Sequence, residues 1–251
     1  MSEQTPLSLG TEDIKKLLMR YAVPAIVAMT AASLYNMMDS IFIGHGVGAL
    51  GIAGLAVTFP FINLAAAFGS LVGVGASTLV SVKMGQKDLK SAEAVLGNVL
   101  LLNTVIGFLF MTVCLIFLDP ILYFFGASAD TLPYARDYMK VILYGNLITH
   151  IYMGLNEVMR ASGYPQRAMM ATLFAVLING VLNALFIFVL DMGIKGAALG
   201  TICAQFLALL GVLYHFPVRK VLFVFKRNFK VRWHIVRNAG HRVVAFPDES
   251  L

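Results

Sequence analysis

Six long apolar stretches restrict the fold of this sequence more than any other feature. They run approximately over residues 21–44, 52–82, 92–118, 134–155, 168–190 and 196–216. Each has the length of about 20 residues that a helix needs to cross a hydrocarbon layer roughly 30 Å thick. The strands of a membrane β-barrel are only about ten residues long, so these stretches exclude a barrel. The sequence therefore predicts an all-α integral membrane protein with six transmembrane helices.

The composition supports a membrane location. Of the 251 residues, 59% are apolar and 13% are charged, whereas a soluble domain has about 25% charged residues. The net charge of +6 is spread between the apolar stretches, which favours a membrane surface over nucleic acid as its partner. The two cysteines, Cys114 and Cys203, lie inside apolar stretches without a metal-binding spacing. We therefore expect no disulfide, no transition metal and no cofactor.

The positions of the basic residues predict the orientation. All but three of the 19 Lys and Arg residues fall on one side of the six stretches, and the three on the other side are Arg136, Lys140 and Lys195. Because basic loops stay in the cytoplasm, both termini of this multi-pass protein are expected on the cytoplasmic side of the plasma membrane. The expected segments are a leader (1–20), a six-helix lobe (21–216), a basic connector (217–238) and a divergent polar tail (239–251).

A few polar residues inside the apolar stretches suggest a cation site. Asp39 is the one acidic residue well inside a stretch, where a charge is costly and so marks a functional candidate. Asn179 and Asn183 are four residues apart, on one face of the fifth helix, and Thr201 lies in the sixth. Counted from the helix ends, Asp39, Asn183 and Thr201 all fall roughly 8 to 10 Å below the outer surface. Carboxylate, amide and hydroxyl oxygens at one depth suit a monovalent cation or an exchangeable proton.

Simpler explanations exist for the same residues. Asp39 could be solvated near the outer interface, and the two asparagines could serve only to join helices. Four further residues are candidates for the lining of a cavity: Asn36, Tyr144, Asn146 and Gln205. Pro24 interrupts the first stretch and permits either a bend during transport or a static curve.

Five segments resemble the multidrug and toxic compound extrusion (MATE) family, and within it the bacterial multidrug branch. In chain order they read LLMRYAVPAIVAMTAASLYNMMDSIFIG, GLAVTFPFINL, GVGASTLVSVKMGQKDLKSAEAVLGN, EVMRASGYPQRAM and NGVLNALFIFVLDMGIKGAALGT, and the resemblance extends over roughly residues 8 to 233. It implies a cation site in the amino-terminal lobe formed by Asp39, Asn179, Asn183 and Thr201. It also implies antiport driven by Na⁺ or H⁺ that exports small organic, often cationic, compounds, and no enzymatic activity.

The sequence departs from the family pattern in having one lobe. Members normally have twelve helices in two lobes, whereas the segment AGHRVVAFPDESL, beginning at residue 239, cannot span a membrane. We expect truncation or a frameshift, with a carboxy-terminal lobe missing; a half-transporter that forms a homodimer is the alternative. The chain could also be a flippase for lipid-linked or polysaccharide substrates, or a nonfunctional fragment. A flippase is disfavoured because no Lys or Arg lies deep in the stretches.

Overall fold

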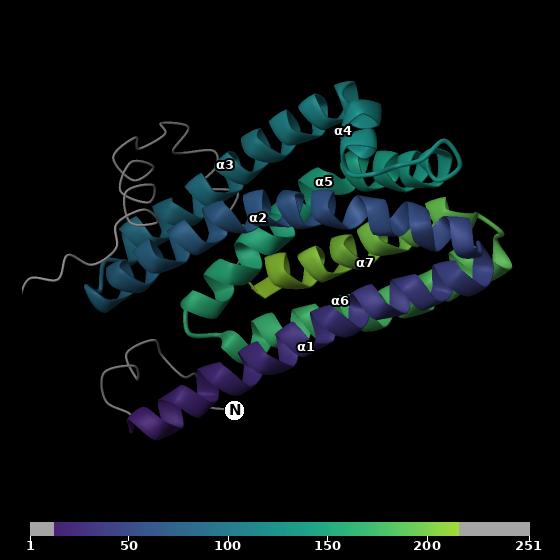
Figure 1. The fold of residues 1–251 in the computed structure, drawn as a ribbon. Helices are drawn as coiled ribbons and strands as arrows, with labels where there is room; N and C mark the ends of the chain where they lie inside the picture. The colour runs from purple at the N-terminus through teal and green to yellow at the C-terminus, as the bar shows by residue number, and fades with distance from the viewer. Residues whose placement is uncertain (1–12, 216–251) are drawn as a thin grey trace, which may run out of the picture.

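The chain forms a bundle of long helices in a computed structural model that describes residues 13–215 (Figure 1). The described elements are α1 (Ile14–Gly46), α2 (Ala49–Gly85), α3 (Leu89–Ile116), α4 (Leu118–Phe124), α5 (Leu132–Ala161), α6 (Pro165–Asn183), the π-helix η2 (Ala184–Val189) and α7 (Gly193–His215). No strand occurs among these residues. The all-helical prediction is confirmed, while the predicted connector and tail lie outside the described residues, as does most of the leader.

The six predicted stretches correspond to α1, α2, α3, α5, α6 with η2, and α7, but several ends differ. Helix α1 begins at Ile14, inside the predicted leader, where the Asp13 side chain accepts a hydrogen bond from the backbone N–H of Lys15 (3.3 Å). Asp119 and Pro120, which follow the third predicted stretch, lie in the first turn of the short helix α4. A proline is tolerated there because the first-turn N–H groups have no partner within the helix.

Helix α5 is the central element of the bundle. It packs against α2, α3, α6 and α7, and residues along its whole length are buried. Five described helices, α1, α2, α3, α6 with η2, and α7, are long and apolar enough to cross a membrane by themselves. Helix α5 has 30 residues but is more polar, since it carries Asn146, His150 and Asn156. These side chains are buried among neighbouring helices, which is where a membrane protein tolerates polar residues.

Helices α2 and α5 run parallel in a constant register. A Cβ atom added to Gly54 would meet Tyr134 and Ala135, one added to Gly69 would meet His150, and one added to Gly73 would meet Gly154. Further along, the Ser81 hydroxyl donates to the carbonyl of Ala161 at 3.3 Å, across a separation of 80 residues. Small residues at the contact points let the two backbones approach closely, as is typical of membrane helices.

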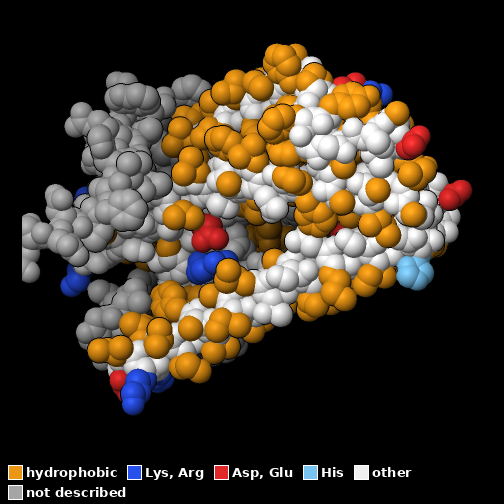
Figure 2. Space-filling view, viewed as in Figure 1, with side chains coloured by type: hydrophobic (Ala, Val, Ile, Leu, Met, Phe, Trp, Pro, Cys, Tyr) orange, Lys and Arg blue, Asp and Glu red, His pale blue; other side chains and the backbone are white. Residues whose placement is uncertain are grey.

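The surface is predominantly apolar, as Figure 2 shows for one face. Ion pairs lie toward the two ends of the bundle. Arg136 pairs with Asp119 (2.5 Å) and Lys195 with Asp137 (3.3 Å) at one end, and Lys83 with Asp88 (3.9 Å) at the other. A surface with an apolar belt between charged ends suits a bundle that lies in a bilayer.

Candidate functional site

The structure brings together the four residues that the sequence singled out as a cation site. Asp39 on α1, Asn179 and Asn183 on α6, and Thr201 on α7 are all buried. The Asn183 side-chain amide donates to Asp39 Oδ1 at 2.5 Å and to Asn179 Oδ1 at 3.1 Å. Asn179 in turn donates to Thr201 Oγ1 at 3.4 Å. A connected polar group therefore joins three helices inside an otherwise apolar bundle.

Glycines at the helix contacts make room for this group. A Cβ atom added to Gly200 of α7 would lie 2.5 Å from Asn183 Oδ1, so a larger residue there would displace the amide. Likewise, Gly180 of α6 accommodates the end of the Met38 side chain, which lies next to Asp39 in the sequence. Helix α6 changes to the π-helix η2 directly after Asn183, and the Asn183 Oδ1 atom has no hydrogen-bond partner among the described residues.

The oxygen and nitrogen of the Asn179 amide have the same shape, so the group can be placed in two ways that satisfy different partners. In one, its oxygen accepts from Asn183 and faces the carboxylate of Asp39. In the other, its nitrogen donates to Asp39 Oδ1 at 3.0 Å and its oxygen accepts from the backbone N–H of Thr201 at 3.3 Å. The second placement gives the Asp39 carboxylate an additional donor, and in both placements Asn179 stays within the polar group.

Two tyrosines border the site and were missed by the sequence analysis. The hydroxyl groups of Tyr35 and Tyr138 lie near Thr201 and close enough to Asp39 to interact with its charge. Tyr35 is four residues before Asp39 on α1. This spacing places both residues on one face of the helix and could have identified Tyr35 from the sequence. Tyr138 comes from α5, and one sequence gives no indication that this residue faces α1 and α7.

The four candidate cavity residues do not join the polar group. Asn36 and Tyr144 are exposed. Asn146 is buried and donates to the carbonyl of Gly107 at 3.2 Å, which joins α5 to α3. Gln205 accepts from the Thr149 hydroxyl at 2.5 Å, which joins α7 to α5. Their role in lining a cavity stays a prediction.

The proline and the cysteines lie inside the helices, as expected. Pro24 is buried within the continuous helix α1, and the bend expected there during transport stays a prediction. Among residues 13–215, no three His, Cys, Asp or Glu side chains are grouped so that they could hold a metal ion. Cys114 is buried and Cys203 half-buried, and neither forms a disulfide.

The fold and the polar group define one helical lobe of a membrane transport protein. The family model described as MatE matches residues 24–185, and the chain belongs to this family. The predicted family membership is thereby confirmed.

Curated relatives with similar sequences are multidrug export proteins. The chain is 30% identical over 216 residues to the multidrug export protein MepA of Staphylococcus haemolyticus, an alignment that covers 86% of this chain and 48% of that protein. MepA of Staphylococcus aureus is 28% identical over 201 residues, covering 80% of this chain and 45% of the relative. The chain thus spans about half the length of the curated relatives it matches.

Solved structures show the same arrangement of helices. A MATE protein crystallised in a bent conformation superposes with a TM-score of 0.86 at 27% identity, covering 95% of this chain and 53% of that one. An outward-facing multidrug resistance MATE transporter superposes with a TM-score of 0.85 at 26% identity and the same coverage. The bundle therefore corresponds to one of the two lobes of such a transporter.

Proposed function

We propose that this chain is the amino-terminal lobe of a cation-coupled antiporter that exports small organic, often cationic, compounds. The observation that carries the proposal is the buried carboxylate of Asp39, held at 2.5 Å by the Asn183 amide. Such a group binds a proton or Na⁺ because neutralising it removes the cost of a buried charge. The multidrug export activity named for the relatives supports the class of substrate.

In the proposed cycle, the coupling ion acts on the contact between α1, α6 and α7. Arrival of Na⁺ or H⁺ at Asp39 neutralises the carboxylate that accepts from the Asn183 amide, and so weakens the hydrogen bond that holds α1 against α6. Because Pro24 leaves α1 without one backbone donor, the helix bends there at low cost. An inward ion gradient thereby drives alternating access to the substrate.

Complete transport requires a second lobe, since the proposed cavity lies between two six-helix units. This partner is either a carboxy-terminal lobe or a second copy of the chain. The plasma membrane, with both termini in the cytoplasm, is the proposed location. The basic residues on that side support this orientation.

Substitution of Asp39 tests the proposal. Asp39→Asn, placed in a two-lobed homologue whose first lobe carries residues 13–215 of this chain, is expected to abolish export because an amide cannot hold a charge or exchange a proton. Resistance to a cationic drug, measured in a host without its own exporters, provides the readout. Asp137→Asn, on the exposed pair with Lys195, is the matched control and should export normally. Undiminished export by the Asp39 variant would overturn the proposal.

A further inference from the structure

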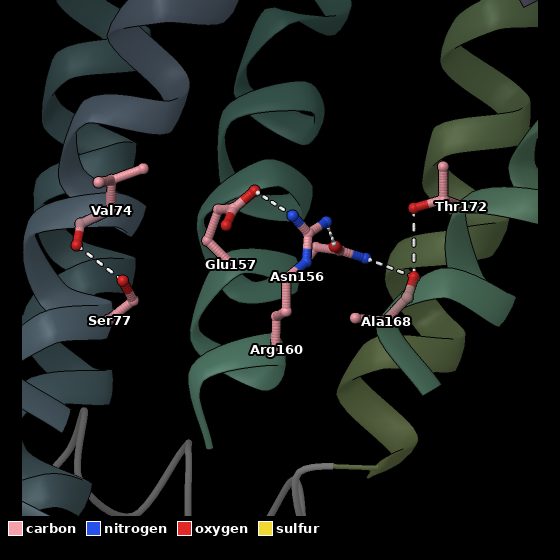
Figure 3. Close-up of polar contacts among 7 residues, drawn as sticks. All are labelled: Val74, Ser77, Asn156, Glu157, Arg160, Ala168 and Thr172. Carbon is pink, nitrogen blue, oxygen red and sulfur yellow. Dashed lines mark hydrogen bonds and ion pairs between the residues drawn. The ribbon is translucent and has the colours of Figure 1, made fainter. Parts of the chain in front are cut away.

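A second carboxylate lies in the bundle, far along the chain from Asp39. Glu157 and Arg160, on the last turns of α5, form an ion pair with 3.5 Å between Glu157 Oε1 and Arg160 Nη1 (Figure 3). Their side chains are 28% and 30% exposed, so both are half-buried. Figure 2 shows a hollow in this face of the molecule, with one acidic and one basic side chain next to each other at its rim.

Helix α2 packs closely beside Glu157 and has no side chain at the point of contact. A Cβ atom added to Gly73 would lie 3.2 Å from Glu157 Cβ and 2.9 Å from Gly154 Cα, so the absence of a side chain at Gly73 gives Glu157 its place. On α2, one turn beyond Gly73, the Ser77 hydroxyl donates to the Val74 carbonyl of its own helix at 2.7 Å (Figure 3). Within the described part of the chain, Arg160 is the ion-pair partner of the Glu157 carboxylate.

Arg160 has an alternative partner on the side of α6. Its guanidinium group donates to Asn156 Oδ1 at 3.4 Å, and the Asn156 amide is itself fixed by a 3.1 Å hydrogen bond to the Ala168 carbonyl (Figure 3). Both contacts of the guanidinium group are longer than the roughly 2.8 Å of a strong charge-assisted bond. Arg160 can therefore leave Glu157 without losing all its hydrogen bonds.

We propose that Glu157 binds the positive group of an organic cation and that Arg160 is the resident counter-ion which this cation displaces. In the empty state, Arg160 neutralises the half-buried carboxylate; when the substrate enters the hollow, the guanidinium group moves onto Asn156. This inference rests on the proposed function, because it assumes a cationic substrate. It assigns substrate and coupling ion to different carboxylates, Glu157 and Asp39.

Equilibrium binding of ethidium to the purified 251-residue chain, followed by fluorescence at low salt, tests this assignment. Glu157→Gln should raise the Kd about three- to fivefold, as expected for the loss of a partly exposed ion pair. Arg160→Gln should lower the Kd by a similar factor, because it removes the competing cation. Asp137→Asn, which breaks a comparable ion pair at the other end of α5, should leave the Kd unchanged.

The two substitutions are expected to change the Kd for ethidium in opposite directions, and this distinguishes a binding role of the pair from a purely structural one. If the pair only stabilised α5, both substitutions would weaken binding or neither would change it, and either result would overturn the inference. If the unaltered chain binds ethidium and Glu157→Gln does not change the Kd, the inference is overturned while the proposed function stands. No ethidium binding by the unaltered chain would also overturn the inference, but not the proposed function, whose cavity requires a second lobe. If the Glu157→Gln variant does not fold, the Arg160→Gln variant decides: a lower Kd supports the inference, and an equal or higher Kd overturns it.

Discussion

Asp39 shows how single residues make this site visible in the sequence. A carboxylate deep in an apolar helix costs about 2.5 to 3.5 kcal/mol on insertion scales, so it persists only where donors such as the Asn183 amide offset the cost. Asp39, Asn179, Asn183 and Thr201 were predictable because each is a polar residue in an apolar stretch at a matching depth. Tyr138 was not, because tyrosines are common near the ends of membrane helices and reveal no facing direction.

The Asn183 amide should contribute measurably to stability. Asn183→Leu removes the donor that Asp39 and Asn179 share, and the loss of a partner by buried polar groups costs about 1 to 3 kcal/mol. We expect a lower midpoint of thermal unfolding in detergent. Asn36→Leu, on the exposed surface of α1, is the control and should change the free energy of unfolding by less than about 0.5 kcal/mol. Equal midpoints for the two variants would contradict the hydrogen bonds described here.

At the scale of helices, the sequence predicted which elements exist better than where they end. Long apolar stretches identify the spans, but hydropathy alone ended the fourth stretch at residue 155, whereas α5 continues to Ala161. The missed residues include Glu157 and Arg160. Gly73 of α2 leaves space for Glu157, and Asn156 accepts a hydrogen bond from Arg160. The contacts that position them come from residues far away in the chain, so local patterns do not reveal them.

Gly73 is a position on α2 where added volume should be poorly tolerated. An alanine Cβ there would lie 2.9 Å from the Gly154 Cα, a backbone atom that cannot rotate away. Gly73→Ala is expected to destabilise the bundle by about 1 to 3 kcal/mol. Gly211→Ala, at a helical glycine of α7 with open space around it, should be neutral or slightly stabilising. Thermal unfolding of both variants checks this difference, which would vanish if α2 and α5 were not in close contact.

For the whole molecule, the division of basic residues between two sides predicts the orientation. After Cys114 and Cys203 are replaced by serine, a cysteine at Ala129, in the exposed segment between α4 and α5, should react with an impermeant thiol reagent added to intact cells. A cysteine at Gln86, exposed between α2 and α3, should react only after the cells are opened. Labelling of the Gln86 variant in intact cells would reverse the proposed orientation.

The parallel register of α2 and α5 determines which part of the lobe is free to move. The two helices meet at several levels between Gly54 and Ser81, so a slide of one turn would force side chains into every glycine contact simultaneously. Helix α1 instead packs mainly on α6, through the group around Asp39. If Asp39 is the coupling carboxylate, as proposed, a transport cycle would move it with α1 while α5 keeps Glu157 stationary. The distance between Asp39 and Glu157 would then report the state of the transporter.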